Sequence, residues 1–292
     1  MKAKLLTLRA LSSTRVGAGR GLGHIDLPIV REKVTNFPYV PASSVKGVLA
    51  DDASAKATDN KLREAAFGKK EGASTTAGSL VFTDARLLAL PILSFYGTFA
   101  LVSCPAILNR LKDDLGSFDM SELDFSVPTL KENQMFVPAG SALAKNGFAY
   151  LLDVDFKTEE NDAADKFLDF LKRRFQLFSE PERRQRFAIV SDDAFAFLCE
   201  TGTEVSAHIR IDDEKKTVAK GALWYEETVP AETCFYGFVC CDRVYDERST
   251  PDELLQTFCP ENPVYLQFGG KSSTGKGRCV CSFISLNGGS ND

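Results

Sequence analysis

Alternating apolar and polar positions predict strands at both ends of the chain, and apolar positions at helical spacing predict helices between them. The opening segment KAKLLTLRALS is typical of a β-strand. Residues 160–178 repeat phenylalanine and leucine at helical spacing among charges, which predicts an amphipathic helix. In STPDELLQTFC, Thr250 as N-cap, Pro251 at the first position and Glu253 as the partner in a capping box predict a short helix.

A long hairpin and two loops complete the pattern. Two β-rich arms around the polar turn Asp212–Lys216 predict a hairpin over about residues 204–230. Four glycines within seven residues make a loop of residues 14–32, called the first loop below. Residues 53–77 are polar and glycine-rich, which predicts a mobile insertion. No repeat or linker divides residues 1–292, so we expect one α+β domain with an RNA-recognition-motif or ferredoxin-like βαββαβ core, large insertions and a protruding hairpin.

Composition places the chain among ordinary globular proteins. Its 292 residues are 44% hydrophobic and 26% charged, enough for a sizeable core. No apolar run reaches the length of a membrane span, and the N-terminus turns polar too quickly for a signal peptide. We therefore expect a cytoplasmic protein without a membrane partner.

Cysteine spacing argues against a structural zinc site. The chain has eight cysteines but no C-x-x-C pair, and only two histidines accompany them. Most of the cysteines stand within apolar, strand-like runs, as in ETCFYGFVCC and CVCSFISL. We expect buried, reduced thiols.

The net charge of −5 is spread unevenly. Acidic residues gather in TEENDAADKFLD and DDEK, whereas the glycine-bearing loops carry lysine and arginine. We therefore expect a polyanion to be bound locally, at these loops, and not over a whole face.

The segment QFGGKSSTGKGRC resembles a P-loop but lacks two of its parts. Gly270 to Lys276 fit the nucleotide-binding pattern, yet Gly277 replaces the hydroxyl residue that reaches magnesium. The β-rich run CVCSFISL follows where a helix is required, so the loop joins two strands. Its glycines and cations still suit a polyanion, and the alternative is a surface hairpin with incidental charge.

A second cation stands near a predicted helix start. In PYVPASSVKGVLADDA, Ser43 and Ser44 are able to cap a short helix that begins near Val45. Lys46 then lies in the first turn, which is unfavourable unless an anion binds there. The alternative is a solvated lysine.

Four segments, read in order, resemble one family. They are VGAGRGLGHIDLPIVRE with FPYVPASSVKGVLADD, then GSLVFTDARLLALPILSFYGTFALVSCPAILNRL, IRIDDEKKTVAKGALWYEETVPAET and LQFGGKSSTGKGRC. Together they resemble the RAMP-type backbone subunit of type III-B (Cmr) CRISPR effector complexes. The resemblance implies copies that stack along CRISPR RNA, beside large, small and end-capping subunits. It also implies that the hairpin, called the thumb, wedges into the duplex of guide and target RNA.

The resemblance also implies which residues bind RNA. Guide contacts would come from the first loop, the short helix and residues Gly269 to Arg278, called the terminal loop below: Arg20, Ser43, Ser44, Lys46, Gly269, Gly270, Lys271, Ser272, Lys276 and Arg278. Trp224 and Tyr225 are candidates for the thumb wedge. For Trp224 the alternative is cross-strand packing within the hairpin.

Relatives of this family cleave target RNA with an aspartate of the first loop, and the match here is Asp26. The 2′-hydroxyl of RNA is its own nucleophile, so one carboxylate can act as a base or hold a divalent cation, Mg²⁺ or Mn²⁺. The alternative is that Asp26 bonds loop amides before Pro28. His24 is a second candidate acid or base, whereas His208 is expected to be packed or on the surface.

Charged positions leave further alternatives open. Arg31 is able to pair with Glu32 or to touch phosphate. Arg15 stands where many relatives have histidine, a change that keeps a cation. Ala50–Asp52 replaces a segment that often carries arginine, a change that removes one, so guide contacts at the end of the short helix are in question. Three alternatives for the whole chain are a structural spine subunit without catalysis, a RAMP-type endonuclease for CRISPR precursor RNA, and a P-loop NTPase.

Overall fold

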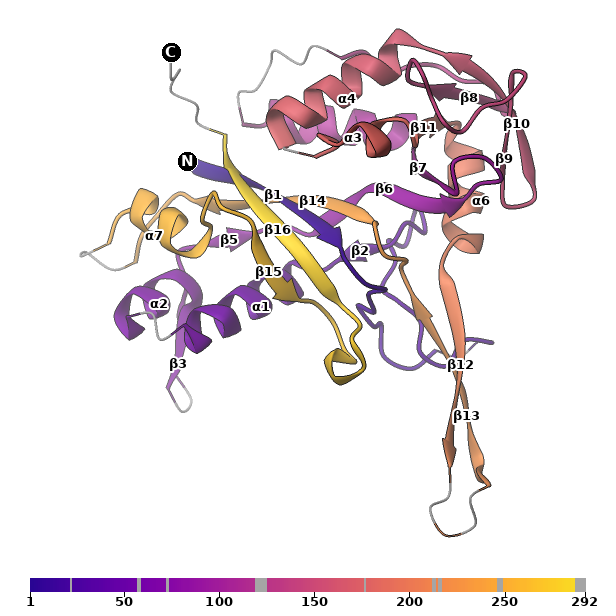
Figure 1. The fold of residues 1–292 in the computed structure, drawn as a ribbon. Coiled ribbons are helices and arrows are strands. Elements are labelled where there is room, and N and C mark those ends of the chain that lie inside the picture. Colours follow the sequence, from indigo (N-terminus) through magenta and orange to yellow (C-terminus); the bar gives the residue numbers. More distant parts are fainter. Residues whose placement is uncertain are drawn as a thin grey trace.

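The computed structural model of the chain describes residues 1–21, 23–56, 59–71, 74–118, 125–175, 177–211, 214, 217–245 and 249–286. Figure 1 shows a central sheet with helices below it, an α/β lobe above it and a two-stranded hairpin that projects away from both. The lobe comprises residues 99–201 and is called the upper lobe below.

The central sheet is antiparallel and built around the N-terminal strand. Its strand order is β15-β16-β1-β14-β6, with short β2 (Tyr39–Val40) on β6 and β5 (Val81–Phe82) on β14. The five main strands are β1 (Lys2–Ala10), β6 (Ala85–Leu93), β14 (Cys234–Cys241), β15 (Val264–Gln267) and β16 (Arg278–Ser285). Helix α1 (Ala42–Ala55) follows β1, and α7 (Pro251–Phe258) follows β14. The chain order β1-α1-β6-β14-α7-β16 agrees with the predicted βαββαβ order, and the α+β class is confirmed.

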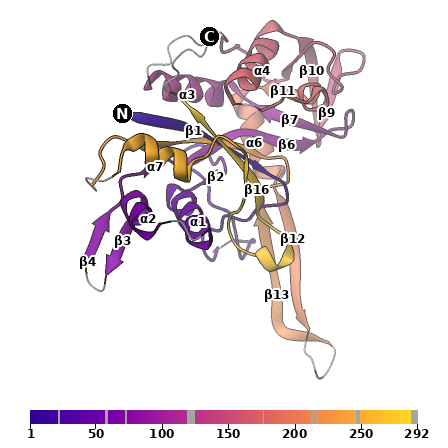
Figure 2. The ribbon, with the colours of Figure 1, turned by 60° about the vertical axis from the view of Figure 1, so that its left-hand side comes forward.

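Both faces of this sheet are covered, which explains its apolar sequence. Helices α1, α2 (Asn60–Phe67) and α7 lie below it (Figure 2). On the other face, Tyr236 of β14 donates a hydrogen bond to Asp114 of α3 (Pro105–Gly116), at 2.9 Å. Phe238 packs against Phe118, with ring centroids 4.7 Å apart. Strand β14 is therefore buried along its whole length.

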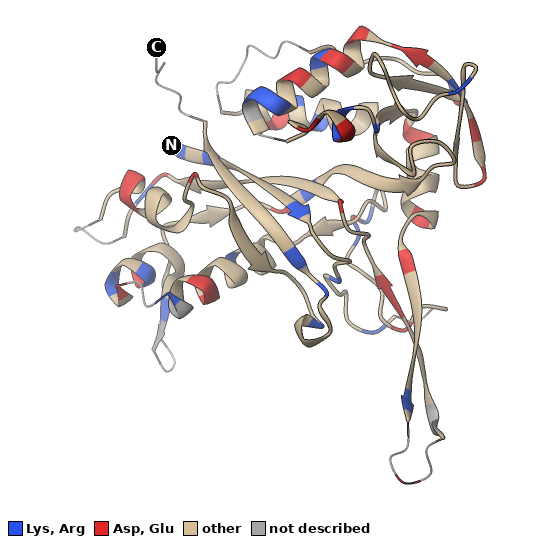
Figure 3. Cartoon of the chain, viewed as in Figure 1, with Lys and Arg blue, Asp and Glu red and all other residues tan. Residues whose placement is uncertain are grey.

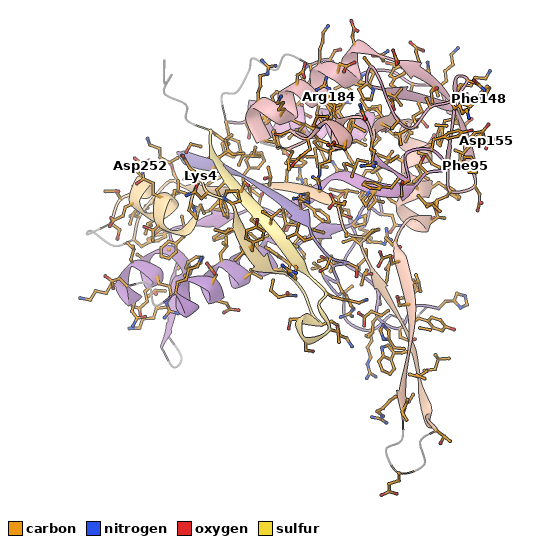
Figure 4. All side chains as sticks on the ribbon, viewed as in Figure 1. Lys4, Phe95, Phe148, Asp155, Arg184 and Asp252 are labelled. Carbon is orange, nitrogen blue, oxygen red and sulfur yellow. The ribbon has the colours of Figure 1, made fainter. Side chains whose placement is uncertain are left out.

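The upper lobe holds a second set of strands that nearly closes on itself. From β6 the order continues through β7 (Phe99–Ser103), β11 (Phe187–Val190), β8 (Gln134–Val137), β10 (Val154–Glu160) and β9 (Phe148–Leu151). A bridge between Ser94 and Leu151 brings β9 back to the end of β6. Phe95, Phe148 and Asp155 lie together at this outer edge (Figure 4).

Helices of the lobe confirm the amphipathic prediction. Helix α4 (Asp162–Phe175) lies within the predicted range 160–178, and its Phe167, Phe170 and Phe175 are buried. Short α5 (Pro181–Arg184) and α6 (Asp192–Thr201) complete the lobe. None of the helices in the described ranges has the length and apolar character needed to cross a membrane.

The predicted hairpin and the predicted cap are both present. The thumb consists of β12 (Glu204–Ile211) and β13 (Val218–Thr228), which pair antiparallel. Of the predicted turn Asp212–Lys216, only Glu214 lies within the described residues. At the start of α7, the Thr250 hydroxyl accepts a hydrogen bond from the Glu253 amide, at 3.2 Å, as the capping pattern predicts.

Residues 53–77 carry more regular structure than we expected of a mobile insertion. Helix α1 continues to Ala55, and α2 is followed by a hairpin of β3 (Gly68–Glu71) and β4 (Ser74–Ala77). Residues 57, 58, 72 and 73 lie outside the described ranges. Phe67 is buried against Phe82 and Phe258, with centroids 6.0 and 5.0 Å away. A few apolar positions therefore anchor an otherwise polar segment to the core.

All eight cysteines are free and buried, as predicted, and this makes the fold sensitive to high pH. Burial raises the pKa of Cys234, Cys240 and Cys279 from 9.0 to about 11, and that of Cys259 to about 12. Thiols of the unfolded chain ionise near pH 9, whereas the folded chain keeps them protonated. Their contribution to stability is therefore complete below pH 9 and is lost as pH rises through about 11.

We expect the free energy of unfolding to fall steeply above pH 9, measured by urea titrations from about pH 7 to about pH 10.5. Cys234→Ala provides the control, because it removes one such thiol. The variant should lose less stability over this pH range than the parent chain does. An equal loss in both would mean that this thiol does not contribute.

Candidate functional site

Two glycine loops from opposite ends of the sequence lie side by side at one end of the central sheet (Figure 1). The Gly277 amide donates to the carbonyl oxygen of Ser13, at 2.9 Å, and the Gly270 amide to that of Arg15, at 3.2 Å. The Arg278 amide donates to the Ser12 hydroxyl, at 3.0 Å. The first loop and the terminal loop therefore form one surface.

Glycine is required in the terminal loop by this packing. Gly269 has a φ of +72°, and a side chain there would collide with the Arg15 carbonyl oxygen. Gly277 has a φ of +80°, and a side chain there would collide with the Phe268 carbonyl oxygen. The loop joins β15 to β16, as predicted, so no helix N-terminus follows it to receive a nucleotide phosphate.

Asp26 lies where the first loop meets the thumb. The loop folds back on itself. The Val30 amide donates to the backbone carbonyl oxygen of Val16, at 2.8 Å, and the Gly21 amide donates to the backbone carbonyl oxygen of Asp26, at 2.9 Å. Leu27 then forms a parallel bridge with Glu226 of β13.

The Asp26 carboxylate is held by the thumb itself. The Tyr225 amide donates to its Oδ2, at 2.8 Å. The side chain is exposed, and its Oδ1 has no partner among the described residues. The amide that Asp26 binds belongs to the thumb and not to its own loop, which differs from the structural alternative raised by the sequence. His24 is exposed nearby in sequence and has no fixed partner in the described part of the chain.

The two faces of the thumb differ sharply. Trp224 packs across the hairpin on His208, with rings 5.6 Å apart and 16° from parallel, so the cross-strand alternative for Trp224 is what the structure shows. Tyr225 points to the opposite face and is 41% exposed. That face also exposes aliphatic side chains that our sequence analysis missed, although the alternation of EVSAHIRI signals them: Val205, Ile209, Ile211 and Leu223.

Glu226 is a buried carboxylate beneath the terminal loop. It is fully buried, and neither of its oxygens has a hydrogen-bond partner among the described residues. The ammonium groups of Lys271 and Lys276 lie 3.5 and 3.6 Å from it. Lys271 also lies over the Trp224 ring, 5.7 Å from its centroid. Two lysines that the sequence assigns to guide RNA therefore share an internal counter-ion.

Glu227 anchors the first loop to the thumb. It accepts hydrogen bonds from Arg31 at 2.6 Å, from the Thr203 hydroxyl at 2.9 Å and from the Ile29 amide at 3.1 Å. Glu32 pairs instead with Arg110, at 2.8 Å. The alternative in which Arg31 pairs with Glu32 is therefore wrong, because neighbouring side chains in extended backbone point to opposite sides.

Two of the three predicted contacts on α1 line a separate groove, and Ser44 does not. The helix starts at Ala42, whose amide donates to Asp84 at 2.7 Å, so Ser43 and Ser44 lie within the first turn and are not the cap. Ser43 and Lys46 line a groove of about 530 Å³ against α2 and β3. Ala50 also lines it, whereas Asp52 pairs with Lys56.

Three remaining predicted residues are exposed at the two loops. Arg20 lies in the first loop, Ser272 begins a 3₁₀ turn (Ser272–Thr274) and Arg278 begins β16. Acidic residues gather along β10 and the first two turns of α4, whose last turn is basic, while both loops carry basic residues (Figure 3). The expected charge separation is thus present for TEENDAADKFLD, whereas only Glu214 of DDEK lies within the described residues.

Asp26 is the candidate ligand for a divalent cation. In the described ranges, no group of three or more His, Cys, Asp or Glu side chains is placed to hold a metal ion. Mg²⁺ is commonly held by one or two carboxylates together with phosphate oxygens and water. The open oxygen of an exposed Asp26 fits that arrangement.

Comparisons with known proteins agree with this picture. The RAMP superfamily model matches residues 7–280. The chain is 32% identical, over 99% of both chains, to "CRISPR system Cmr endoribonuclease Cmr4" of Pyrococcus furiosus. It is 25% identical, over 92% of both, to "CRISPR system CMR subunit Cmr4" of Saccharolobus solfataricus.

Solved structures show the same fold. Oligomeric Cmr4 from Pyrococcus furiosus matches with a TM-score of 0.76 and 25% identity, over 98% of this chain and 100% of that one. A chain of the type III-B Cmr-beta complex bound to cognate target RNA matches with a TM-score of 0.73 and 20% identity, over 97% of both, which shows the fold alone. The resemblance inferred from the four sequence segments is confirmed.

Proposed function

The chain belongs to the RAMP superfamily, and from this premise we propose that it is a backbone subunit of a type III-B CRISPR ribonucleoprotein in the cytoplasm. Copies of it multimerise along CRISPR RNA, beside the large, small and end-capping subunits, and cleave complementary target RNA at regular intervals. The observation that carries the catalytic part is the exposed Asp26 carboxylate, fixed by the amide of thumb residue Tyr225.

The thumb supplies the geometry for cleavage. A hairpin that separates base pairs costs a few kcal/mol per step and leaves a nucleotide unstacked beside it. The exposed apolar face with Ile209, Leu223 and Tyr225 suits this wedge better than the packed Trp224. The Asp26 carboxylate is hydrogen-bonded to β13, the thumb strand that carries Leu223 and Tyr225. A nucleotide displaced by the thumb therefore lies next to this carboxylate.

The chemistry needs little more than alignment and proton transfer. Asp26 either accepts the proton of the 2′-hydroxyl as a base or holds a divalent cation beside the phosphate. In both roles the 2′-oxygen bonds to phosphorus and the bond from phosphorus to the 5′-oxygen breaks. The products are a 2′,3′-cyclic phosphate and a 5′-hydroxyl, whose oxygen takes up a proton. A bound Mg²⁺ or Mn²⁺, held by Asp26 and RNA phosphates, would neutralise charge on the phosphate.

Assembly and cleavage test the proposal separately. Size-exclusion chromatography with light scattering on guide RNAs of increasing length should show more copies bound as the guide lengthens. Reconstituted with the other Cmr subunits, the chain should cut target RNA at evenly spaced sites. One copy per RNA, whatever its length, would favour a precursor-processing endonuclease, and multimers that never cut would favour a structural subunit.

A further inference from the structure

Arg15 lies between the two glycine loops. Its guanidinium rests against Gly17, so closely that a side chain at Gly17 would be 2.8 Å from Nη2 and 2.9 Å from Cζ. Its Nη1 lies 3.8 Å from the position that a side chain of Gly270 would occupy. The Arg15 carbonyl oxygen accepts the Gly270 amide. Both ends of the residue therefore belong to the junction of the first loop and the terminal loop.

This guanidinium has no counter-ion among the described residues. Its Nε is buried and has no hydrogen-bond partner there. Arg31 has Glu227, and Lys271 and Lys276 share Glu226. A buried donor without an acceptor destabilises the fold, so the site is suited to an acceptor from outside the chain.

The surrounding backbone also favours an anion. Lys271 is in the left-handed region, with a φ of 69°, and precedes a 3₁₀ turn. Its amide and that of Ser272 meet no acceptor in the described ranges. Successive amides in such a turn form a concave surface that binds phosphates.

We propose that Arg15 binds an RNA backbone phosphate at the junction of the first and terminal loops. This rests on the proposed function and names a further contact of that RNA interface. The planar guanidinium matches two phosphate oxygens. Lys271 and Lys276 must exchange Glu226 for phosphate, whereas Arg15 has no ionic partner to give up in the part of the chain that the structure describes.

The salt dependence of RNA binding tests this contact. The full chain is titrated against a fluorescent single-stranded RNA of mixed sequence at several salt concentrations, for the parent chain, Arg15→Gln and Arg15→Lys. Arg15→Gln should lower the slope of log affinity against log salt by about 0.7, the value for one phosphate contact on a single strand. Arg15→Lys should keep the slope.

The matched control is Arg243→Gln, since Arg243 is exposed and follows β14, next to the N-terminal end of β1 and away from the loops. It should leave the slope unchanged. For a single-stranded DNA of the same sequence, Arg15→Gln should lower the slope of log affinity against log salt by the same amount, because RNA and DNA share the phosphate. Thermal unfolding of every variant confirms that it is folded.

The outcomes separate this inference from the proposed function. If the parent chain binds RNA and folded Arg15→Gln keeps its slope, the Arg15 contact is refuted and the proposed function stands. A folded Arg15→Lys that behaves like Arg15→Gln refutes a role for the charge. Failure of the parent chain to bind RNA at any salt concentration refutes the proposed function itself.

Discussion

Replacing Asp26 by asparagine is expected to lower target-RNA cleavage by about 10²- to 10⁴-fold, the range for loss of a positioned acid or base. The amide oxygen of asparagine can still accept the Tyr225 amide, so the loop should keep its place on the thumb. The negative charge, which both a base and a metal ligand require, is removed. Guide binding should be unchanged.

The measurement is single-turnover cleavage by the reconstituted guide complex, with products mapped to the nucleotide. Asp51→Asn is the matched control, because Asp51 is also exposed but lies on α1. Titration with Mg²⁺ or Mn²⁺ then distinguishes the two roles of Asp26. Added metal should partly restore a variant that lost a ligand, and it should not restore one that lost its base. Undiminished cleavage of target RNA by Asp26→Asn would refute the assignment of Asp26 as the catalytic residue.

The second large effect concerns the anchor between the first loop and the thumb. Arg31→Met is expected to lower the free energy of unfolding by about 3–5 kcal/mol, because it leaves the Glu227 charge buried without its partner. The side chains of Arg31 and Glu227 are only 15% and 5% exposed, and their contact is 2.6 Å. Glu227 is adjacent to Glu226, whose backbone pairs with that of Leu27, the residue after Asp26. Loss of the Glu227 anchor should therefore also lower the rate of target-RNA cleavage.

Urea unfolding of two further variants checks the cause. Arg110→Met breaks the pair of Arg110 with Glu32, in which the two side chains are 30% and 21% exposed. It should lower the free energy of unfolding by about 0–1 kcal/mol. The double variant Arg31→Met with Glu227→Gln should recover part of the loss, since no buried charge remains unpaired. Equal losses for Arg31→Met and Arg110→Met would contradict the burial argument.

Local pattern was enough to predict the elements that depend on neighbours in sequence. Thr250, Pro251 and Glu253 predicted the start of α7 because a cap is made within one turn. The alternation on either side of Asp212–Lys216 predicted the thumb for a similar reason. Local pattern misplaced the start of α1, since the group that binds its first free amide is Asp84, from another part of the chain.

The sequence by itself determined the α+β class, the thumb, the two glycine loops and, through the resemblance, the family and Asp26 as candidate. Only the tertiary structure decided that the thumb holds Asp26, that Glu226 faces Lys271 and Lys276, and that Arg15 lacks a counter-ion within the described ranges. These contacts join residues that are far apart in sequence, such as Tyr225 and Asp26. Sheet register and loop packing bring them together, and no local pattern encodes that geometry.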